Sequence, residues 1–115
     1  MNTSVTMAGV DATERRIRLV VSDIDGTLLG PSGVPTPRTS SALRRVRSAG
    51  VTVALATARR WTGGVPAAAA LGIEGPLILY DGALVRSYPD GEVITHEAMD
   101  RDHVAEACRA LAAGG

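Results

Sequence analysis

Three short apolar runs divide the first two thirds of the chain and predict buried strands. They span residues 18–22, 51–56 and 77–80 and are rich in Val, Leu and Ile, a composition typical of strands covered on both faces. Between these runs, apolar residues recur at helical spacing over 37–49 and 65–71. Strand, helix, strand, helix and strand in this order predict an α/β fold with a doubly wound, Rossmann-like parallel sheet, because parallel neighbours need crossover connections.

Residues at the ends of the two predicted helices support these boundaries. Thr36 can cap the first helix, Pro37 suits its first turn and Gly50 suits its end. Pro66 can open the second helix in the same way, and Gly72 can end it.

The pattern changes after the third predicted strand. Runs over 83–88 and 92–96 flank Pro-Asp-Gly at 89–91, a turn sequence that predicts a β-hairpin. Asp100 or Asp102 can then cap a helix over 101–112, in which one apolar stripe is formed by Val104, Ala107, Cys108 and Leu111. The expected organisation is a disordered tail over 1–16, an α/β core over 17–82, a hairpin over 83–97 and a helical segment over 98–115.

Charge and composition exclude several classes of function. Twelve basic residues, all of them Arg, balance twelve acidic residues, so no net field attracts nucleic acid or an anionic membrane. Every apolar run is far shorter than the roughly 20 residues of a membrane helix, and residues 1–16 lack the apolar segment of a secretory signal. A single cysteine, Cys108, forms no internal disulfide. A reducing, cytoplasmic setting is therefore expected.

Polar residues follow each of the three predicted strands. Ligands of parallel α/β sheets bind beyond the carboxyl ends of the strands, and Asp23, Thr57 and Asp81 occupy these positions. The absence of Lys removes mechanisms that use a phosphate-loop lysine or a Schiff base. The ends of the predicted strands are therefore the expected location of catalytic or binding residues.

Two carboxylates stand at the end of the first strand. Asp23 and Asp25 are two residues apart, so in an extended segment both side chains can face one pocket. Gly26 permits a sharp turn there, and Thr27 brings a hydroxyl close to the pair. This arrangement suits phosphoryl transfer through an aspartyl-phosphate, in which one carboxylate attacks phosphorus and the other, protonated, supplies a proton to the leaving oxygen. We expect mutual repulsion to raise the proton affinity of the second acid.

Other interpretations of Asp-x-Asp-Gly are a plain surface turn and a calcium-binding EF-hand loop. Counting from Asp23 places Leu28 where that loop requires Gly and Val34 where it requires a bidentate Glu. The EF-hand is therefore excluded. Dinucleotide binding is disfavoured because no Gly-x-Gly-x-x-Gly follows the first strand.

Three segments carry a resemblance to a known family. Residues 23–29, Asp-Ile-Asp-Gly-Thr-Leu-Leu, resemble the first motif of the haloacid dehalogenase (HAD) superfamily of phosphatases, and residues 55–59, Leu-Ala-Thr-Ala-Arg, resemble its second motif. Residues 80–85 resemble the Asn-Gly-Ala segment of the Cof-type members, which carry a large α/β cap domain. The similarity runs from about residue 17 to the end of the chain.

This resemblance implies a Mg²⁺-dependent phosphatase of small phosphorylated metabolites. By position, Asp23 would be the nucleophile and a metal ligand, and Asp25 the general acid and base, reaching the metal through its backbone carbonyl. The substrate would be bound by Gly26, Thr27, Thr57 and Arg59. For Thr57 and Arg59, a turn-capping threonine and a merely solvated arginine are the alternative interpretations.

The chain also departs from the family pattern. Ala58 stands where Gly is common, which matters only if that position has a positive φ, and Asp81 replaces the usual Asn. Family members continue through the cap and back into the core, where they supply a third-motif Lys or Arg and a fourth-motif acidic pair. The resemblance thus implies an amino-terminal fragment that ends in the first cap helix and is inactive alone.

Two further hypotheses stay open from the sequence. One is a non-catalytic α/β module for binding or regulation, or a gene remnant without activity. The other is a phospho-acceptor signalling domain, which the missing Lys disfavours. Trp61 can line a cap cleft or cover the sheet edge, and His96, His103 and Cys108 are interpreted as structural or exposed.

Overall fold

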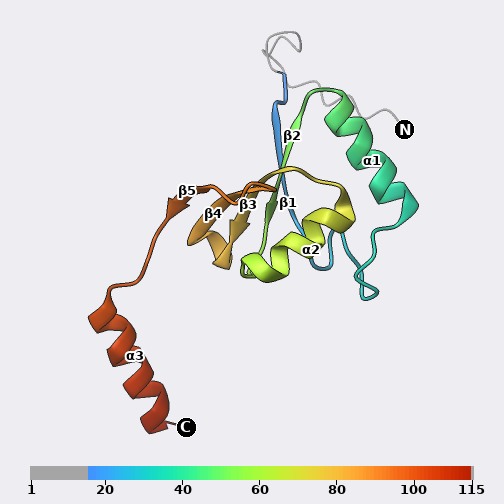
Figure 1. The fold of residues 1–115 in the computed structure, drawn as a ribbon. Coiled ribbons are helices and arrows are strands. Elements are labelled where there is room, and N and C mark those ends of the chain that lie inside the picture. The colour runs from blue at the N-terminus through green and yellow to red at the C-terminus, as the bar shows by residue number, and fades with distance from the viewer. Residues whose placement is uncertain (1–15, 115) are drawn as a thin grey trace, which may run out of the picture.

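The structure, a computed structural model, describes residues 16–114, so the predicted tail lies outside the described residues except for Arg16. Eight longer elements and one short 3₁₀ turn follow one another in the described part (Figure 1). They are β1 (Leu19–Asp23), α1 (Pro37–Ser48), β2 (Thr52–Ala56), α2 (Trp61–Leu71), β3 (Gly75–Leu79), η1 (Tyr80–Gly82), β4 (Leu84–Tyr88), β5 (Val93–His96) and α3 (Arg101–Gly114).

The five strands form one mixed sheet in the order β1-β2-β3-β4-β5. β1, β2 and β3 are parallel, as the sequence predicts, and the α/β Rossmann-like fold is confirmed. The predicted hairpin continues this sheet, because β4 pairs antiparallel with β3, with Ile78 opposite Val85. This pairing satisfies backbone groups that would otherwise be free along the outer edge of β3.

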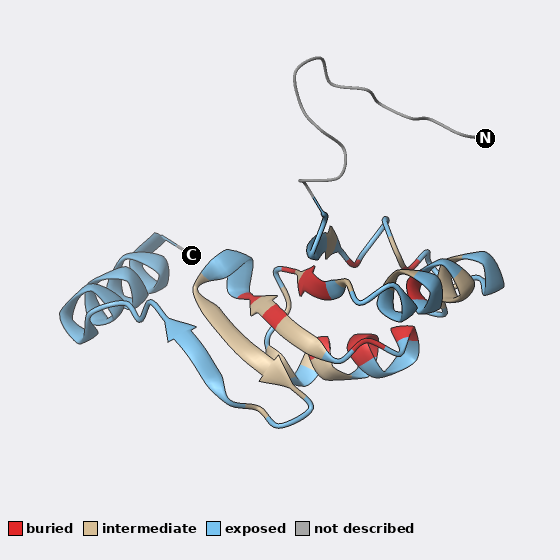
Figure 2. Cartoon of the chain, turned by 90° about the horizontal axis from the view of Figure 1, so that it is seen from above, coloured by how far each residue is buried: buried red, intermediate tan, exposed pale blue. Residues whose placement is uncertain are grey.

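The core lies between one face of the sheet and the helices α1 and α2. Val53, Leu55, Leu77 and Leu79 alternate along β2 and β3 and are almost fully buried. They cluster with residues of both helices, among them Leu43 of α1 and Ala67, Ala68 and Leu71 of α2. Figure 2 shows the buried segments gathered in the middle of the sheet and along α2. The apolar core is therefore concentrated on β2, β3 and α2.

The ends of α1 are those that the sequence predicts. Thr36 caps the helix, because its hydroxyl accepts a hydrogen bond from the N–H of Thr39 at 3.1 Å, and Pro37 is the first helical residue. At the other end Gly50 has a φ of +79° and donates its N–H to the carbonyl of Arg47 at 2.9 Å. Such a left-handed residue stops a helix at little cost only when it is glycine.

Helix α2 begins four residues earlier than we predict from the sequence. Pro66 lies inside it rather than at its start, and the first helical residue is Trp61. A tertiary contact accounts for the difference: the Arg86 guanidinium stacks 4.0 Å from the centre of the Trp61 ring, and Tyr88 packs against the same ring at a centroid distance of 6.4 Å. The predicted end at Gly72 is confirmed by its left-handed conformation.

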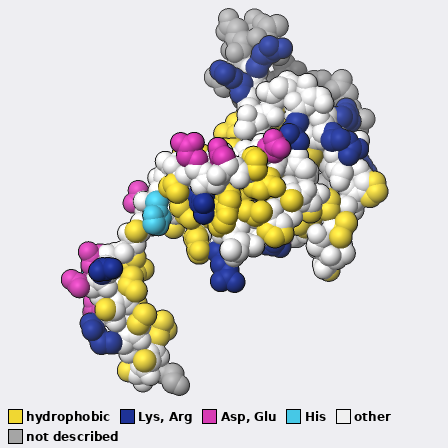
Figure 3. All heavy atoms as spheres, in the orientation of Figure 1, with side chains coloured by type: hydrophobic (Ala, Val, Ile, Leu, Met, Phe, Trp, Pro, Cys, Tyr) yellow, Lys and Arg dark blue, Asp and Glu magenta, His cyan; other side chains and the backbone are white. Residues whose placement is uncertain are grey.

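Helix α3 stands away from the sheet (Figure 1) and contains no buried residue. Asp100 caps it, because its carboxylate accepts a hydrogen bond from the N–H of Asp102 at 2.8 Å. The predicted apolar stripe is present but uncovered, and Figure 3 shows apolar side chains along one side of the helix with charged groups on the other. None of the described helices combines the length and the apolar character that spanning a bilayer requires.

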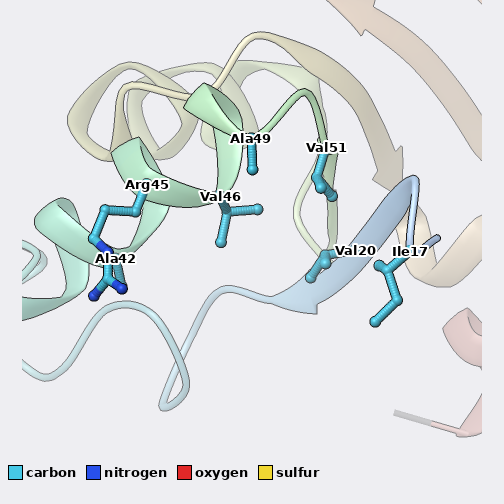
Figure 4. Close-up of a pocket in the computed structure, with 7 residues that line it drawn as sticks. All are labelled: Ile17, Val20, Ala42, Arg45, Val46, Ala49 and Val51. Carbon is cyan, nitrogen blue, oxygen red and sulfur yellow. The ribbon is translucent and has the colours of Figure 1, made fainter. Parts of the chain in front are cut away.

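Strand β1 is an edge strand, and the prediction that both its faces are covered is wrong for the described residues. Leu19 and Val21 remain 53% and 50% exposed. Beside β1, a groove of about 530 Å³ runs toward α1 and is lined mainly by apolar residues such as Val20, Val46 and Val51 (Figure 4). Arg45 is the one charged residue among the described residues that line it. The groove therefore offers apolar contact area and no catalytic chemistry.

Two adjacent glycines of α2 provide a test of this packing. A Cβ built on Gly64 would lie 2.9 Å from Cδ2 of the fully buried Leu79, whereas a Cβ on Gly63 would meet Arg59 side-chain atoms at ordinary distances of 3.5 Å or more. Both substitutions by Ala favour the helix equally, but only Gly64→Ala overpacks the core, which costs about 1–3 kcal/mol.

We therefore expect Gly64→Ala to be less stable than Gly63→Ala by about 1–3 kcal/mol. Denaturant unfolding of the two purified variants measures this difference. Equal stabilities would show that α2 does not pack on Leu79 as described.

Candidate active site

The carboxyl ends of β1, β2 and β3 meet at one edge of the sheet. The parallel register places Asp23 beside Ala56, and Ala56 beside Ile78. Around this edge lies a hollow of about 320 Å³, here called the Asp23 hollow, whose polar lining residues are Asp23, Thr57 and Asp81. The three strand-end residues singled out from the sequence therefore line one hollow.

A tight turn after β1 positions the Asp23 carboxylate. The N–H groups of Leu28 and Leu29 both donate to the carbonyl of Ile24, whose side chain is fully buried. Gly26, with a φ of +75°, donates its N–H to the carbonyl of Leu29 at 2.8 Å, so that donor belongs to the turn. The hydroxyl of Thr27 donates to Oδ2 of Asp23 at 3.2 Å. Gly26 and Thr27 thus shape and orient the site.

Asp25 does not share the Asp23 hollow, contrary to our expectation from the sequence. Strand alternation ends at Asp23, because the chain turns over residues 24–29. Asp25 instead accepts two hydrogen bonds from Arg59, with Nε to Oδ2 at 2.9 Å and Nη2 to Oδ1 at 2.5 Å. Both residues line a second hollow of about 380 Å³, here called the Arg59 hollow, together with Gly26, Gly30 and Gly33.

The ion pair also sets the charge state of Asp25. Hydrogen bonding to the Arg59 guanidinium lowers the pKa of the Asp25 carboxyl below its usual value, and this effect exceeds the opposing effect of desolvation. The same bond raises the pKa of Arg59. We expect from the sequence that repulsion between the two acids raises the proton affinity of Asp25, and this is wrong in the structure because Arg59 contacts Asp25 directly.

Arg59 is anchored by its backbone as well as by its side chain. Its N–H donates to Oγ1 of Thr57 at 3.0 Å, and its carbonyl accepts from the N–H of Tyr80 at 3.1 Å. Its Nη1 donates to the carbonyl of Gly63, at the start of α2, at 3.0 Å. The sequence contains no signal for the contributions of Gly63 and Tyr80, because their backbone atoms make them.

Thr57 is the one buried polar side chain among the described residues, at 7% exposure. Its backbone bridges two strand ends, since its N–H donates to the carbonyl of Ile78 and its carbonyl accepts from the N–H of Asp81. Because Oγ1 already accepts a hydrogen bond from Arg59, the hydroxyl hydrogen remains available to donate into the hollow. Thr57 is therefore both a turn-capping threonine and a poised donor.

The segment after β3 has an unusual backbone. Tyr80 and Asp81 have φ values of +49° and +54°, a region that Asp tolerates better than most residues. Asp81 thereby brings a second carboxylate to the Asp23 hollow. Ala58 has no positive φ, so its difference from the common Gly causes no backbone strain.

The remaining candidates lie elsewhere. Trp61 packs on Arg86 and Tyr88 near the turn of the hairpin, and His96, His103 and Cys108 are exposed. Within residues 16–114, no group of three or more His, Cys, Asp and Glu side chains gathers where it could hold a metal ion.

The Asp25–Arg59 pair predicts a specific acid dependence of stability. Because the pKa of Asp25 is lower in the folded protein than its ordinary value of 3.8, the pair stabilises the fold above that value. Its contribution is lost as the pH falls through the lowered pKa. We expect Asp25→Asn to be less stable than wild type at about pH 6, and this deficit to shrink as the pH falls through the lowered pKa of Asp25. Arg59→Gln should lose the same pH-dependent part and also a pH-independent part, because it removes the hydrogen bond from Nη1 to the Gly63 carbonyl.

Thermal unfolding across this pH range measures the effect in both variants. Because each variant removes the same pair, the pH-dependent part of the two deficits should be alike. A deficit that persists unchanged to the acid end would contradict the ion pair as the cause.

Comparisons with known proteins agree with this architecture. The haloacid dehalogenase-like hydrolase family matches residues 20–113. A phosphoglycolate phosphatase from Methanopyrus kandleri is 36% identical over 93 residues, which cover 81% of this chain and 40% of that protein. An uncharacterized hydrolase from Schizosaccharomyces pombe is 36% identical over 86 residues, which cover 72% of this chain and 28% of the relative. The chain thus spans less than half the length of these relatives.

Solved structures show the same fold. A haloacid dehalogenase-like hydrolase from B. subtilis superposes with a TM-score of 0.76 at 26% identity, over 85% of this chain and 34% of that one. A Bacteroides thetaiotaomicron protein described among the phosphatases of the HAD superfamily gives a TM-score of 0.75 at 24% identity, over 90% of this chain and 38% of its own. The match over residues 20–113 and the shared fold together show that the chain belongs to the haloacid dehalogenase-like hydrolase family.

Proposed function

We propose that this chain carries the nucleophile half of a Mg²⁺-dependent phosphatase that hydrolyses small phosphate esters through an aspartyl-phosphate. The observation that carries the proposal is the shared hollow at the carboxyl edge of the sheet, where the Asp23 carboxylate and the buried Thr57 hydroxyl lie together. A nucleophile beside a donor for the phosphoryl oxygens is the minimal arrangement for this chemistry.

In the first step, an oxygen of Asp23 forms a bond to phosphorus while the bond from phosphorus to the ester oxygen breaks. Thr27 holds Oδ2 of Asp23, and Oδ1 accepts no hydrogen bond from any described residue. Asp25, released from Arg59 and protonated, gives its proton to the departing oxygen. In the second step, water attacks phosphorus, the bond to Asp23 breaks and Asp25 takes up the proton of the water.

Thr57 is assigned the role of phosphoryl donor. Its hydroxyl hydrogen is free to donate, because Oγ1 already accepts a hydrogen bond from the Arg59 N–H. The Thr57 backbone is held in place by two further hydrogen bonds. A preorganised donor of this kind stabilises charge that develops on the phosphoryl oxygens. Gly26 and Thr27 contribute by fixing the turn and the Asp23 carboxylate, and Arg59 by facing the leaving group.

The donor chemistry at the Asp23 hollow fits Mg²⁺. This ion is usually held by one or two carboxylates, by phosphate oxygens of the substrate and by water. Asp23 and Asp81 both line the hollow, and the family resemblance adds the backbone carbonyl of Asp25. When bound, the ion offsets the negative charge of the phosphoryl group. Asp23 would hold it, while Thr57 and the turn after β1 orient the ester.

The substrate class that we propose is a small phosphorylated metabolite, and the relative from Methanopyrus kandleri is a phosphoglycolate phosphatase. A cytoplasmic location is part of the same proposal, and the exposed free thiol of Cys108 fits a reducing compartment. We further propose that turnover requires residues beyond 1–115, because the relatives are more than twice as long as the region they share with this chain.

The nucleophile assignment is tested with a generic phosphate ester and Mg²⁺ in the full-length enzyme. Asp23→Asn should abolish phosphate release, because an amide forms no acyl phosphate. Asp25→Asn should slow turnover about 100- to 10,000-fold, the usual contribution of general acid and base catalysis. Asp100→Asn, which removes a carboxylate that caps α3, serves as the control and should keep wild-type turnover. Near-normal turnover of Asp23→Asn would disprove the assignment, and an inactive wild type would favour a non-catalytic module.

The isolated polypeptide of residues 1–115 should release no phosphate. Electrostatic donors to a transferring phosphoryl group are worth about 3–4 kcal/mol each, and the arginine beside the site is engaged by Asp25. Phosphate release by 1–115 and by the full-length enzyme is compared at equal concentration. Activity of 1–115 that is lost in Asp23→Asn would overturn this part of the proposal.

A further inference from the structure

The Arg59 hollow lies on the side of the site where a leaving group would depart. Asp25, the group assigned to protonate the departing oxygen, lines this hollow, while Asp23 lines the other. The two hollows are neighbours, because the Arg59 N–H is hydrogen-bonded to Oγ1 of Thr57, which lines the Asp23 hollow. A leaving group that takes its proton from Asp25 would therefore lie beside Arg59.

The ion pair with Asp25 shows that the Arg59 side chain can bind a carboxylate. Its guanidinium holds the carboxylate of Asp25 through two hydrogen bonds, the bidentate geometry in which arginine recognises carboxylates. Asp25 and Arg59 are 34 residues apart in the sequence. The Asp25 side chain is 59% exposed and the Arg59 side chain is 35% exposed. Both groups are thus accessible from solvent, and the pair can exchange partners.

The surroundings of Arg59 leave room for a small acid. Gly26, Gly30 and Gly33 contribute no side chain to the hollow, whose volume is about 380 Å³. A Cβ built on any of these three glycines would have no heavy atom within 4 Å. The guanidinium donates to the carbonyl of Gly63, and the Arg59 backbone is hydrogen-bonded to Thr57 and Tyr80. The site is therefore rigid on the arginine side and open on the ligand side.

We infer that Arg59 determines substrate class by binding a carboxylate on the leaving group of the phosphate ester, which replaces the Asp25 carboxylate on its guanidinium. This inference rests on the proposed phosphatase function and adds the chemistry of the leaving group. The exchange keeps Arg59 paired throughout and frees Asp25 for the departing oxygen. An ester with a neutral leaving group lacks the group that displaces Asp25.

The test measures binding and not turnover. The probes are phosphonoacetate, which carries a carboxylate and a carbon–phosphorus bond that resists hydrolysis, and propylphosphonate, a neutral-tailed counterpart of similar size. Their dissociation constants are measured by calorimetry with the full-length enzyme in the presence of Mg²⁺. Phosphonoacetate should bind wild type at least about tenfold more tightly than propylphosphonate, as expected for hydrogen bonds between charged groups.

Substitutions then locate the preference. Arg59→Gln should remove the preference by weakening the binding of phosphonoacetate and not that of propylphosphonate. Arg59→Lys should retain part of the preference. Arg60→Gln is the matched control, because Arg60 is exposed and forms no ion pair with another described residue. Asp25→Asn should make phosphonoacetate bind about threefold to fivefold more tightly when Arg59 is present. In the double variant with Arg59→Gln it should have no such effect, because the Asp25 carboxylate competes with the ligand only for Arg59.

Three results would overturn the inference: equal affinity of wild type for both probes, equal weakening of both probes by Arg59→Gln, or equal tightening by Asp25→Asn in both backgrounds. The last result would indicate a general effect of charge. The proposed function is judged separately by phosphate release, so a preference for phosphonoacetate in an enzyme that hydrolyses no ester would support the binding site and reject the phosphatase.

Discussion

The parallel pairing of β1 with β2 is the constraint on which the candidate site depends. Five consecutive residue pairs, from Leu19 opposite Thr52 to Asp23 opposite Ala56, hold the two strands in one register. A shift by one residue would turn Asp23 toward the helices and away from the hollow, because side chains alternate along a strand. The crossover through α1 makes the strands run in the same direction, so both carboxyl ends arrive at the same edge. The geometry of the candidate site and the hydrophobic core therefore depend on the same backbone hydrogen bonds.

Much of this arrangement can be predicted from the sequence, because it follows from local patterns. The strands, the caps of α1 and the strand-end positions of Asp23, Thr57 and Asp81 each have a signal within a few residues. The start of α2 and the partner of Asp25 have none. Trp61 extends the helix because Arg86 and Tyr88 pack on its ring. Asp25 is separated from Asp23 because the chain turns over residues 24–29, and its partner Arg59 is 34 residues distant in sequence. Spacing rules describe an extended strand and fail where the chain turns.

The site has a rigid side, formed by Thr57 and the backbone of Arg59, and an exposed side, formed by the Asp25–Arg59 ion pair. Thr57 and the backbone of Arg59 are tied to the ends of β3 and η1 by hydrogen bonds that do not depend on ligand. The Asp25 carboxylate, by contrast, is exposed and held only by its ion pair. Exposed pairs of this kind contribute little to stability. A weak pair is suited to a residue that must change partners, because the energy needed to separate it is well within what a bound anion supplies.

The isolation of α3 divides the chain into two regions with different local stability. Residues of β2, β3 and α2 share a buried core, and opening any of them exposes apolar surface from the others. Helix α3 has no buried residue, and a helix of 14 residues held mainly by its own hydrogen bonds is marginal in water. Its amides therefore open in local fluctuations that leave the sheet intact, at a far smaller free energy than amides of the core strands. Hydrogen exchange along this chain is thus expected to fall steeply in rate from α3 to β2, with no single global value.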